Sequence, residues 1–171
     1  MKHLYFIRHG LSVMNEQGLL AGSTDTPLAP VGKQQARAAG QAARKLGIQL
    51  IVASPLSRAK STATIIAEEI GYPAEAILYD DRTKERHFGN MEATPWHPGI
   101  SFNHNDTVES YDAIMQRAED FKNWLDERSE DTILVVSHGA FLRALCSLYL
   151  PDMPYQNTTA TMPNAEIMTI V

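Results

Sequence analysis

The chain of 171 residues is 44% hydrophobic and 20% charged, which is typical of a globular protein of one domain with a buried core. Its formal net charge of −5 argues against a general nucleic-acid-binding protein, because no basic surface would dominate its electrostatic field. A single cysteine, Cys146, excludes an intramolecular disulfide bond.

The N-terminus and the apolar segments bear on localisation. Met1 and Lys2 lead directly into a short apolar run, without the apolar region and cleavage site of a signal peptide. No apolar stretch approaches the roughly 20 residues of a membrane span. Cys146 lies in the apolar segment AFLRALCSLYL, which favours an inert buried thiol over a nucleophile. We therefore expect a soluble cytoplasmic protein with no membrane partner.

Strand-like and helix-like patterns alternate along the chain. In chain order the patterns predict a strand at 3–7, a helix at 31–46, a strand at 49–53, a helix at 57–70, a strand at 76–79, a helix from about 106, a strand at 132–136, a helix at 140–150 and a candidate final strand at 166–171. Such alternation predicts an α/β fold, a three-layer α/β/α sandwich whose central sheet is mainly parallel. The four earlier strands are predicted to be buried, whereas the last one suits a sheet edge.

The helix boundaries are predicted from caps and apolar spacing. Gly47 is placed to end the helix at 31–46, and Gly71 to end the helix at 57–70. The third helix is expected to begin at Asp106, with Glu109 reaching back as in a capping box. Its predicted apolar stripe has three- and four-residue spacing and consists of Tyr111, Ile114, Ala118, Phe121 and Leu125. The segment 86–106 fits neither period and is predicted to be a lid-like loop.

Polar side chains follow each of the first four strands. Arg8 and His9 follow the first, Arg58 the second, Glu85 the third and His138 the fourth. Ligands of open α/β sheets bind at the carboxyl ends of the strands, so these side chains are expected to meet at one rim. Arginine forks suit phosphate oxygens, and helix N-termini near Arg58 and His138 attract anions. The sequence therefore predicts a phosphate site that contains a possible nucleophile.

The motifs at these strand ends resemble those of the histidine phosphatase superfamily, also called phosphoglycerate-mutase-like. The matching motifs span nearly the whole chain and are RHG at 8–10, TDTPLAPVGKQQA at 24–36, SPLSRA at 54–59, ERHFGNME at 85–92, VESYDAIMQR at 108–117 and SHG at 137–139. The resemblance implies one histidine phosphatase domain over 1–171, with a short insertion at about 86–106. It implies no cofactor and no metal.

The resemblance also implies a role for each matching residue. His9 is the nucleophile that becomes phosphorylated, and Glu85 is the proton donor for the leaving oxygen. Arg8, Arg58 and His138 hold the phosphoryl oxygens, and Asn15 and Gly139 belong to the same substrate-binding set. The nearby arginines are expected to lower the pKa of His9, a backbone carbonyl to fix its tautomer, and Gly10 to permit tight local backbone.

Other interpretations of single residues remain open. Glu85 lies among Arg82, Lys84 and Arg86, so it also fits a surface cluster of ion pairs. The histidines at 87, 97 and 104 match no metal-ligand spacing, and they fit lid residues that contact substrate or solvent. No G-x-S-x-G motif surrounds Ser137, which argues against a serine hydrolase.

The sequence departs from the family pattern at positions that are expected to affect substrate specificity. Leu11 replaces a common glutamate, His87 and Met91 replace an aspartate and a tryptophan, and Val108 replaces a glycine. The chain is shorter than the mutases and ends soon after its last strand, so we expect an open pocket and hydrolysis. The prediction is a metal-independent phosphomonoesterase for a phosphorylated small molecule, with a phosphoprotein as another candidate substrate. A mutase and a non-catalytic phospholigand-binding module are the alternatives, and the oligomeric state stays open.

Overall fold

A computed structural model describes residues 2–171 and contains one five-stranded sheet. The strands are β1 (His3–Arg8), β2 (Leu50–Ala53), β3 (Leu78–Tyr79), β4 (Thr132–Ser137) and β5 (Ile167–Thr169), and their order across the sheet is β3-β2-β4-β1-β5. The first four run parallel, whereas β5 pairs antiparallel with β1 at one edge. The mainly parallel sheet and the terminal edge strand are as predicted.

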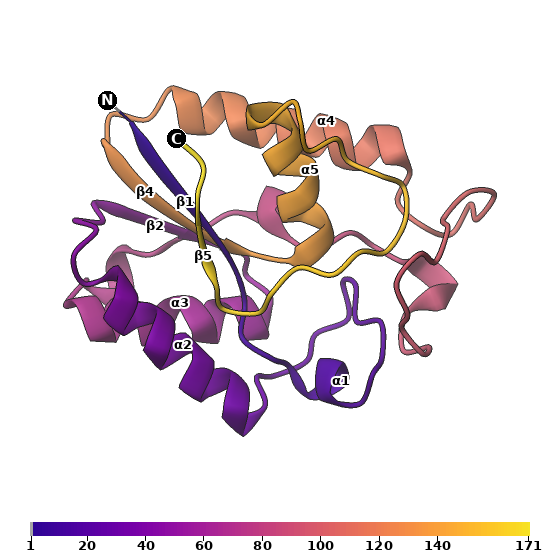
Figure 1. Ribbon diagram of the computed structural model, residues 1–171, viewed down its shortest axis with the longest axis horizontal. Coiled ribbons are helices and arrows are strands. Elements are labelled where there is room, and N and C mark those ends of the chain that lie inside the picture. The colour runs from indigo at the N-terminus through magenta and orange to yellow at the C-terminus, as the bar shows by residue number, and fades with distance from the viewer. Residues whose placement is uncertain (1) are drawn as a thin grey trace.

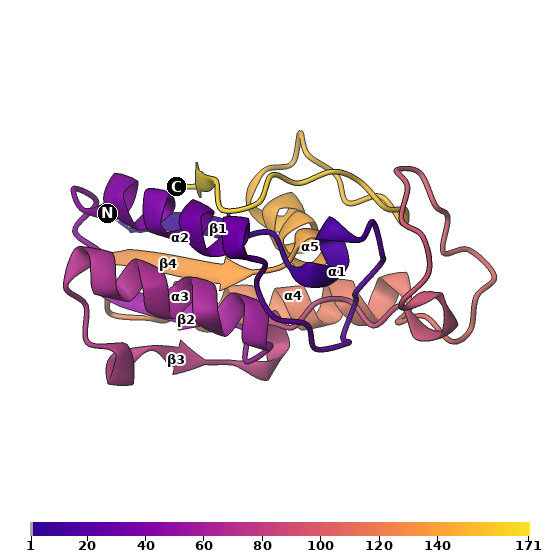
Figure 2. The same ribbon diagram turned by 90° about the horizontal axis from the view of Figure 1, so that it is seen from below.

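Helices cover both faces of the sheet and form the three layers of the predicted sandwich (Figures 1 and 2). The helices α2 (Pro30–Ala43) and α3 (Ser57–Ile70) lie on one face. On the opposite face lie α4 (Tyr111–Asp126) and α5 (Gly139–Tyr149). Shorter elements lie in the connections and are α1 (Val13–Glu16), η1 (Ala74–Ala76), η2 (Asp81–Thr83) and η3 (Gly89–Met91).

Alternation along the central strands divides the core into two apolar layers. Ile133 and Val135 of β4 belong to the layer under α4 and α5, whereas Leu134 and Val136 belong to the layer under α2 and α3. All four side chains are fully buried. A strand buried on both faces reads as a continuous apolar run, which explains why TILVV was recognisable in the sequence.

Two predicted elements are wrong in extent or burial. The strand predicted at 76–79 is reduced to Leu78–Tyr79, and these side chains are 40% and 41% exposed because β3 is an edge strand. The helix predicted to reach Leu46 ends at Ala43. There the chain enters a turn in which the Leu46 N–H donates to the Ala43 carbonyl, before Gly47 adopts a positive φ.

The predicted start of α4 is also wrong. Ser110, not Asp106, caps the helix, since its hydroxyl accepts from the Ala113 N–H at 3.1 Å. Glu109 forms an ion pair with Arg117 of α4 instead of closing a capping box. Tyr111 is 40% exposed and lies outside the buried stripe of α4.

Candidate active site

The pairing of β1 with β4 brings the two candidate histidines together. Arg8 lies opposite Ser137 in this parallel pair, so the next residues, His9 and His138, leave the sheet side by side. Their ring centroids are 5.1 Å apart. The strand-end residues thus meet at one rim of the sheet, as the sequence predicted.

The imidazole of His9 is buried, and both of its ring nitrogens have partners. The Nδ1 atom lies 2.6 Å from the Gly10 carbonyl oxygen, which accepts a hydrogen bond only from a protonated nitrogen. The Nε2 atom lies 3.2 Å from Nε of Arg58 and accepts from it. The ring is therefore the tautomer with a proton on Nδ1 and a lone pair on Nε2.

Burial and positive charge both favour the neutral form of His9. Desolvation lowers the pKa of its imidazole well below the ordinary value of 6.5, and the charges of Arg58 and Arg8 lower it further. Burial, which the sequence did not reveal, is the larger cause. The Gly10 carbonyl opposes the shift but is outweighed.

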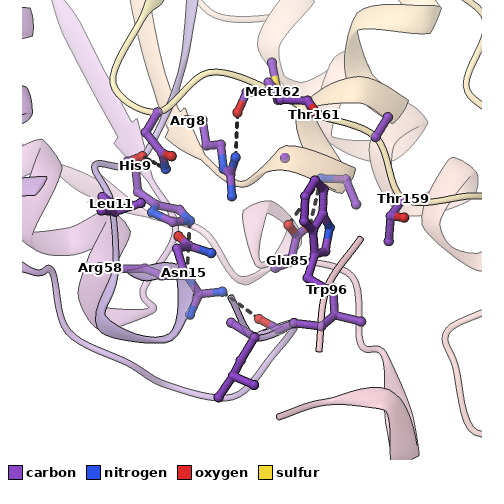
Figure 3. Close-up of a pocket in the computed structure, with 18 of the residues that line it drawn as sticks. Arg8, His9, Leu11, Asn15, Arg58, Glu85, Trp96, Thr159, Thr161 and Met162 are labelled. Carbon is purple, nitrogen blue, oxygen red and sulfur yellow. Dashed lines mark hydrogen bonds between the residues drawn. The ribbon is translucent and has the colours of Figure 1, made fainter. Parts of the chain in front are cut away.

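Arg58, at the start of α3, is held by the loop at 22–24. Its Nη1 and Nη2 atoms donate to the carbonyls of Thr24 and Gly22 at 2.9 and 2.6 Å. Figure 3 shows the guanidinium beside His9 in the pocket. The side chain is 1% exposed, and burial lowers its pKa to about 10 although the charges of Glu85 and Asp25 oppose the shift. The loop thereby fixes the guanidinium that contacts the nucleophile candidate.

Arg8 is held by the C-terminal segment. Its Nη1 atom donates to the Met162 carbonyl at 2.5 Å, and its own carbonyl accepts from the Ala165 N–H at 2.8 Å. The Asn164 side chain donates to the His9 carbonyl at 2.9 Å. The connection between α5 and β5 therefore forms one wall of the site.

Gly10 is required by a close approach of the backbone. A Cβ atom at this position would lie 2.3 Å from the carbonyl oxygen of Gly32, in the first turn of α2. A Cβ on Gly32 would in turn lie 2.1 Å from the Leu11 carbonyl oxygen. The predicted tight backbone after His9 is thus a contact between two glycines of distant motifs.

Glu85 points into the pocket and takes no part in a surface ion-pair cluster. Its Oε1 atom accepts from the N–H groups of Arg86, Ala140 and Phe141 at 2.9, 3.1 and 3.1 Å. The Oε2 atom accepts only from Ala140, at 3.2 Å. One carboxylate oxygen is thus fully engaged, while the other has capacity left to exchange a proton.

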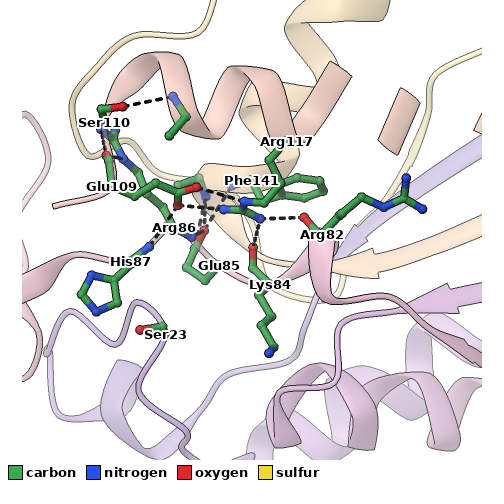
Figure 4. A network of polar contacts seen from close by, with 12 residues as sticks. Ser23, Arg82, Lys84, Glu85, Arg86, His87, Glu109, Ser110, Arg117 and Phe141 are labelled. Atoms are coloured by element: carbon green, nitrogen blue, oxygen red, sulfur yellow. Dashed lines mark hydrogen bonds and ion pairs between the residues drawn. The ribbon is translucent and has the colours of Figure 1, made fainter. Parts of the chain in front are cut away.

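A network of arginines holds the segment that carries Glu85 (Figure 4). Arg117 of α4 donates to the carbonyls of Arg82 and Lys84 at 2.6 and 2.7 Å and pairs with Glu109 at 2.8 Å. Arg86 is 1% exposed and donates twice to the Glu109 carbonyl. Arg117 thus holds the backbone that precedes Glu85, and Arg86 holds the backbone that follows it. Together they fix the position of the Glu85 carboxylate.

The helix N-termini at the site donate to carboxylates of the protein. The α5 N-terminus donates to Glu85, as described above. The α3 N-terminus donates through the Ser57 N–H to Asp25 at 2.8 Å. These N–H groups are thus engaged within the protein, and the arginine side chains that line the pocket carry its positive charge.

His138 lies behind His9 and does not line the pocket. It is fully buried, and its Nε2 atom lies 2.7 Å from the hydroxyl of Ser54. Its Nδ1 atom is buried with no hydrogen-bond partner in the described chain. Burial, together with the charges of Arg58, His9 and Arg8, lowers the pKa of His138 well below 6.5.

The pocket has a volume of about 300 Å³ and brings the other predicted residues together. Arg8, His9, Asn15, Arg58, Glu85 and Gly139 all line it. Sequence reasoning missed several further lining residues, which are Trp96, Arg143, Thr159, Thr161 and Met162. Of these residues, only Arg143 could have been singled out from the sequence, because it is the charged residue of a mainly apolar helix.

The segment 86–106 is mostly irregular, and it is joined to both neighbouring loops. Isolated bridges connect Leu19 with Pro95 and Ser101 with Thr158. The lid histidines His87, His97 and His104 are exposed and do not line the pocket. Among residues 2–171, no three His, Cys, Asp or Glu side chains gather as metal ligands would.

Comparison with known proteins agrees with the geometry. The family model described as "Histidine phosphatase superfamily (branch 1)" matches residues 4–171. A protein of Hydrogenobacter thermophilus, named "Putative phosphoserine phosphatase 2", is 30% identical over 162 residues, which are 86% of this chain and 78% of that protein. The chain belongs to the histidine phosphatase superfamily, as its motifs indicated.

Two further relatives illustrate the range of the family. A "Probable phosphoglycerate mutase GpmB" of Salmonella arizonae is 40% identical over 92 residues, which are 54% of this chain and only 41% of that protein. The solved structure of a phosphoserine phosphatase mutant of Entamoeba histolytica, in complex with phosphoserine, is 26% identical with a TM-score of 0.80. The alignment covers 99% of this chain and 90% of the chain in that structure.

Within residues 2–171, no helix has the length and apolar character needed to cross a bilayer.

Proposed function

We propose that the protein is a phosphomonoesterase that forms a phosphohistidine on Nε2 of His9. The observation that carries this proposal is the hydrogen bond from Nδ1 to the Gly10 carbonyl at 2.6 Å. It leaves a lone pair on Nε2 beside Arg58 and Arg8, where a phosphoryl group gains charge stabilisation. The lowered pKa of His9 keeps Nε2 unprotonated at neutral pH, and an entering phosphoryl group replaces its hydrogen bond from Arg58.

The reaction comprises two displacements at phosphorus. In the first, the Nε2 lone pair forms a bond to phosphorus, the ester P–O bond breaks, and Glu85 donates its proton to the leaving oxygen. In the second, water attacks phosphorus, Glu85 accepts the proton of that water, and the P–N bond to His9 breaks. The less engaged Oε2 atom of Glu85 suits this proton exchange.

The remaining site residues are assigned to binding. Arg8, Arg58 and Asn15 hold the phosphoryl oxygens, and Gly139 leaves space beside the Arg8 guanidinium. In the family pattern His138 belongs to the same set, and its unpartnered Nδ1 is the atom that it would offer. The arginines supply the positive charge, so we propose chemistry without a metal or cofactor.

Substrate and setting follow from the pocket and the relatives. A pocket of about 300 Å³ suits a small phosphomonoester better than a folded phosphoprotein. Two of the three relatives named above are called phosphoserine phosphatases.

We also propose that residues 1–171 form one catalytic domain, with 86–106 as its insertion. We propose that it works in the cytoplasm, where small phosphorylated metabolites are made and consumed.

The decisive experiment compares the wild type with His9→Ala on 4-nitrophenyl phosphate, with EDTA present. Phosphate release by the wild type alone, with acid-labile radiolabel trapped on the protein, supports the proposal. Release by both proteins moves the chemistry away from His9. Transfer to an added hydroxy acid in place of phosphate release indicates a mutase. Phosphate binding by calorimetry without any turnover indicates a binding module.

A further inference from the structure

Arg143 of α5 lies in the pocket but has no place in the phosphoryl chemistry. It follows Gly139 by four residues, so both face the same side of the helix, one turn apart. Gly139 is the residue next to Arg8, since a Cβ there would lie 3.6 Å from the Arg8 Nε atom. The backbone of Arg143 therefore lies about one helical turn beyond the phosphate end of the pocket, roughly 6 Å along the axis.

The guanidinium of Arg143 is held in place without being neutralised. Its plane lies over the Tyr155 ring at 5.3 Å, and its Nη2 atom donates to the Thr158 carbonyl at 3.1 Å. Its Nε atom is buried without a partner, and within residues 2–171 no acceptor contacts Nη1 and no carboxylate pairs with Arg143. A fixed arginine with a free donor group suits an anionic ligand.

The charges that line the pocket are unbalanced. They comprise the guanidinium groups of Arg8, Arg58 and Arg143 and the carboxyl group of Glu85. Burial lowers the pKa of Arg8, the charge of Glu85 raises it, and the charge of Arg143 lowers it again, so Arg143 and Arg8 repel each other. Arg8 and Arg58 are assigned to the phosphoryl group, so the positive charge of Arg143 is left for one further anionic group of the ligand.

We infer that Arg143 binds a carboxylate of the substrate, so that the enzyme prefers phosphomonoesters with a carboxylate a few bonds from the ester oxygen. This inference rests on the proposed phosphatase function and deepens it. A second phosphate would add more negative charge than the three arginines balance. The separation of one helical turn between the two anion sites suits a small phosphorylated carboxylic acid. Trp96 and Phe88 line the same pocket and limit the bulk of the substrate.

The test uses two substrates that differ only in the carboxylate, O-phosphoserine and O-phosphoethanolamine. The measured quantity is the ratio of their kcat/KM values. For the wild type we expect phosphoserine to be preferred about 10- to 100-fold, which is the range for a hydrogen bond to a charged group. Arg143→Gln should bring the ratio close to one, and Arg143→Lys should give an intermediate ratio. Arg37→Gln, which changes an exposed arginine of α2 outside the pocket, should retain the wild-type ratio.

Each outcome has a defined meaning. A wild-type ratio near one, or a ratio that Arg143→Gln leaves unchanged, overturns the inference while the phosphatase function stands. Absence of turnover on both substrates and on 4-nitrophenyl phosphate overturns the phosphatase function. In that case calorimetric binding of the two compounds to wild type and Arg143→Gln tests the carboxylate site alone, and equal affinities overturn it. Thermal unfolding of each variant shows whether the fold is retained.

Discussion

Arg58 donates its Nε–H to Nε2 of His9 across 3.2 Å, while its two terminal nitrogens donate to backbone carbonyls of the loop at 22–24. One side chain thus joins the nucleophile candidate on β1 to a loop of the pocket rim. Its removal should therefore affect chemistry and folding together.

We expect Arg58→Ala to reduce kcat/KM on an aryl phosphate at least 100-fold. The same change should lower the free energy of unfolding by about 2–4 kcal/mol, because two buried carbonyls lose their donor. Urea unfolding measures the second effect. Arg44→Ala is the matched control, because Arg44 is an exposed arginine with a surface ion pair to Glu69, and its loss should change stability by less than about 1 kcal/mol. Full stability of Arg58→Ala would contradict the structural role.

The buried histidines predict a dependence of stability on pH. His9 and His138 have lowered pKa values in the folded protein, whereas in the unfolded chain they titrate near 6.5. Between the lowered value and 6.5 the unfolded state binds more protons. The contribution of the two neutral histidines to the free energy of unfolding is therefore fully present above about pH 7. It is lost as the pH decreases below 6.5, by up to about 1.4 kcal/mol per pH unit for each histidine.

Urea unfolding at pH 7.5, 6.5 and 5.5 measures this slope. His9→Gln removes one of the two titrating groups and should reduce the slope by about half. A slope that is the same in the variant would show that other groups dominate.

The proposed acid role of Glu85 predicts a dependence on the leaving group. Glu85→Gln should slow hydrolysis of alkyl phosphates by about 10²- to 10⁴-fold, because an alkoxide leaves poorly without a proton. On 4-nitrophenyl phosphate the loss in the first displacement should be much smaller, since nitrophenolate leaves unprotonated. Single-turnover release of nitrophenol isolates this step from attack by water. Equal losses on both substrate classes would indicate that Glu85 mainly holds α5.

The contact between Gly10 and Gly32 predicts that neither position accepts a side chain. Gly10→Ala would place its Cβ 2.3 Å from the Gly32 carbonyl oxygen, so β1 and α2 must move apart. We expect a loss of about 1–3 kcal/mol in unfolding free energy together with loss of activity. Gly139→Ala makes its nearest contact at 3.6 Å, so thermal unfolding should show little change. Equal melting temperatures for the two variants would contradict the close approach.

The sequence predicted the strand ends well because fully buried parallel strands are continuous apolar runs. Because HLYFI and TILVV pair as neighbouring parallel strands, His9 and His138 emerge beside each other. The direction of Glu85 was left open by the sequence. Its orientation depends on Arg86 and Arg117, which hold the surrounding backbone by donating to carbonyls distant in sequence.

Other features depended on tertiary contacts that local patterns do not encode. Asp106 and Glu109 have the spacing of a capping box, yet the Glu109 carboxylate is taken by Arg117, and Ser110 caps the helix. The wall formed by Met162 and Asn164 is an irregular segment that bonds to β1 from more than 150 residues away. In the sequence Arg143 is recognisable only as a charged residue in an apolar helix. Its proposed role depends on its position in the pocket, which the fold determines.

The position of β1 between β4 and β5 has a consequence for synthesis of the protein. Its two neighbours are β4, at Thr132–Ser137, and β5, at Ile167–Thr169. A nascent chain therefore carries an apolar strand, β1, that has no pairing partner until β4 and then β5 have left the ribosome. Such long-range pairing slows folding and exposes apolar surface to aggregation. The strand that precedes the nucleophile candidate His9 is therefore made before either of its pairing partners.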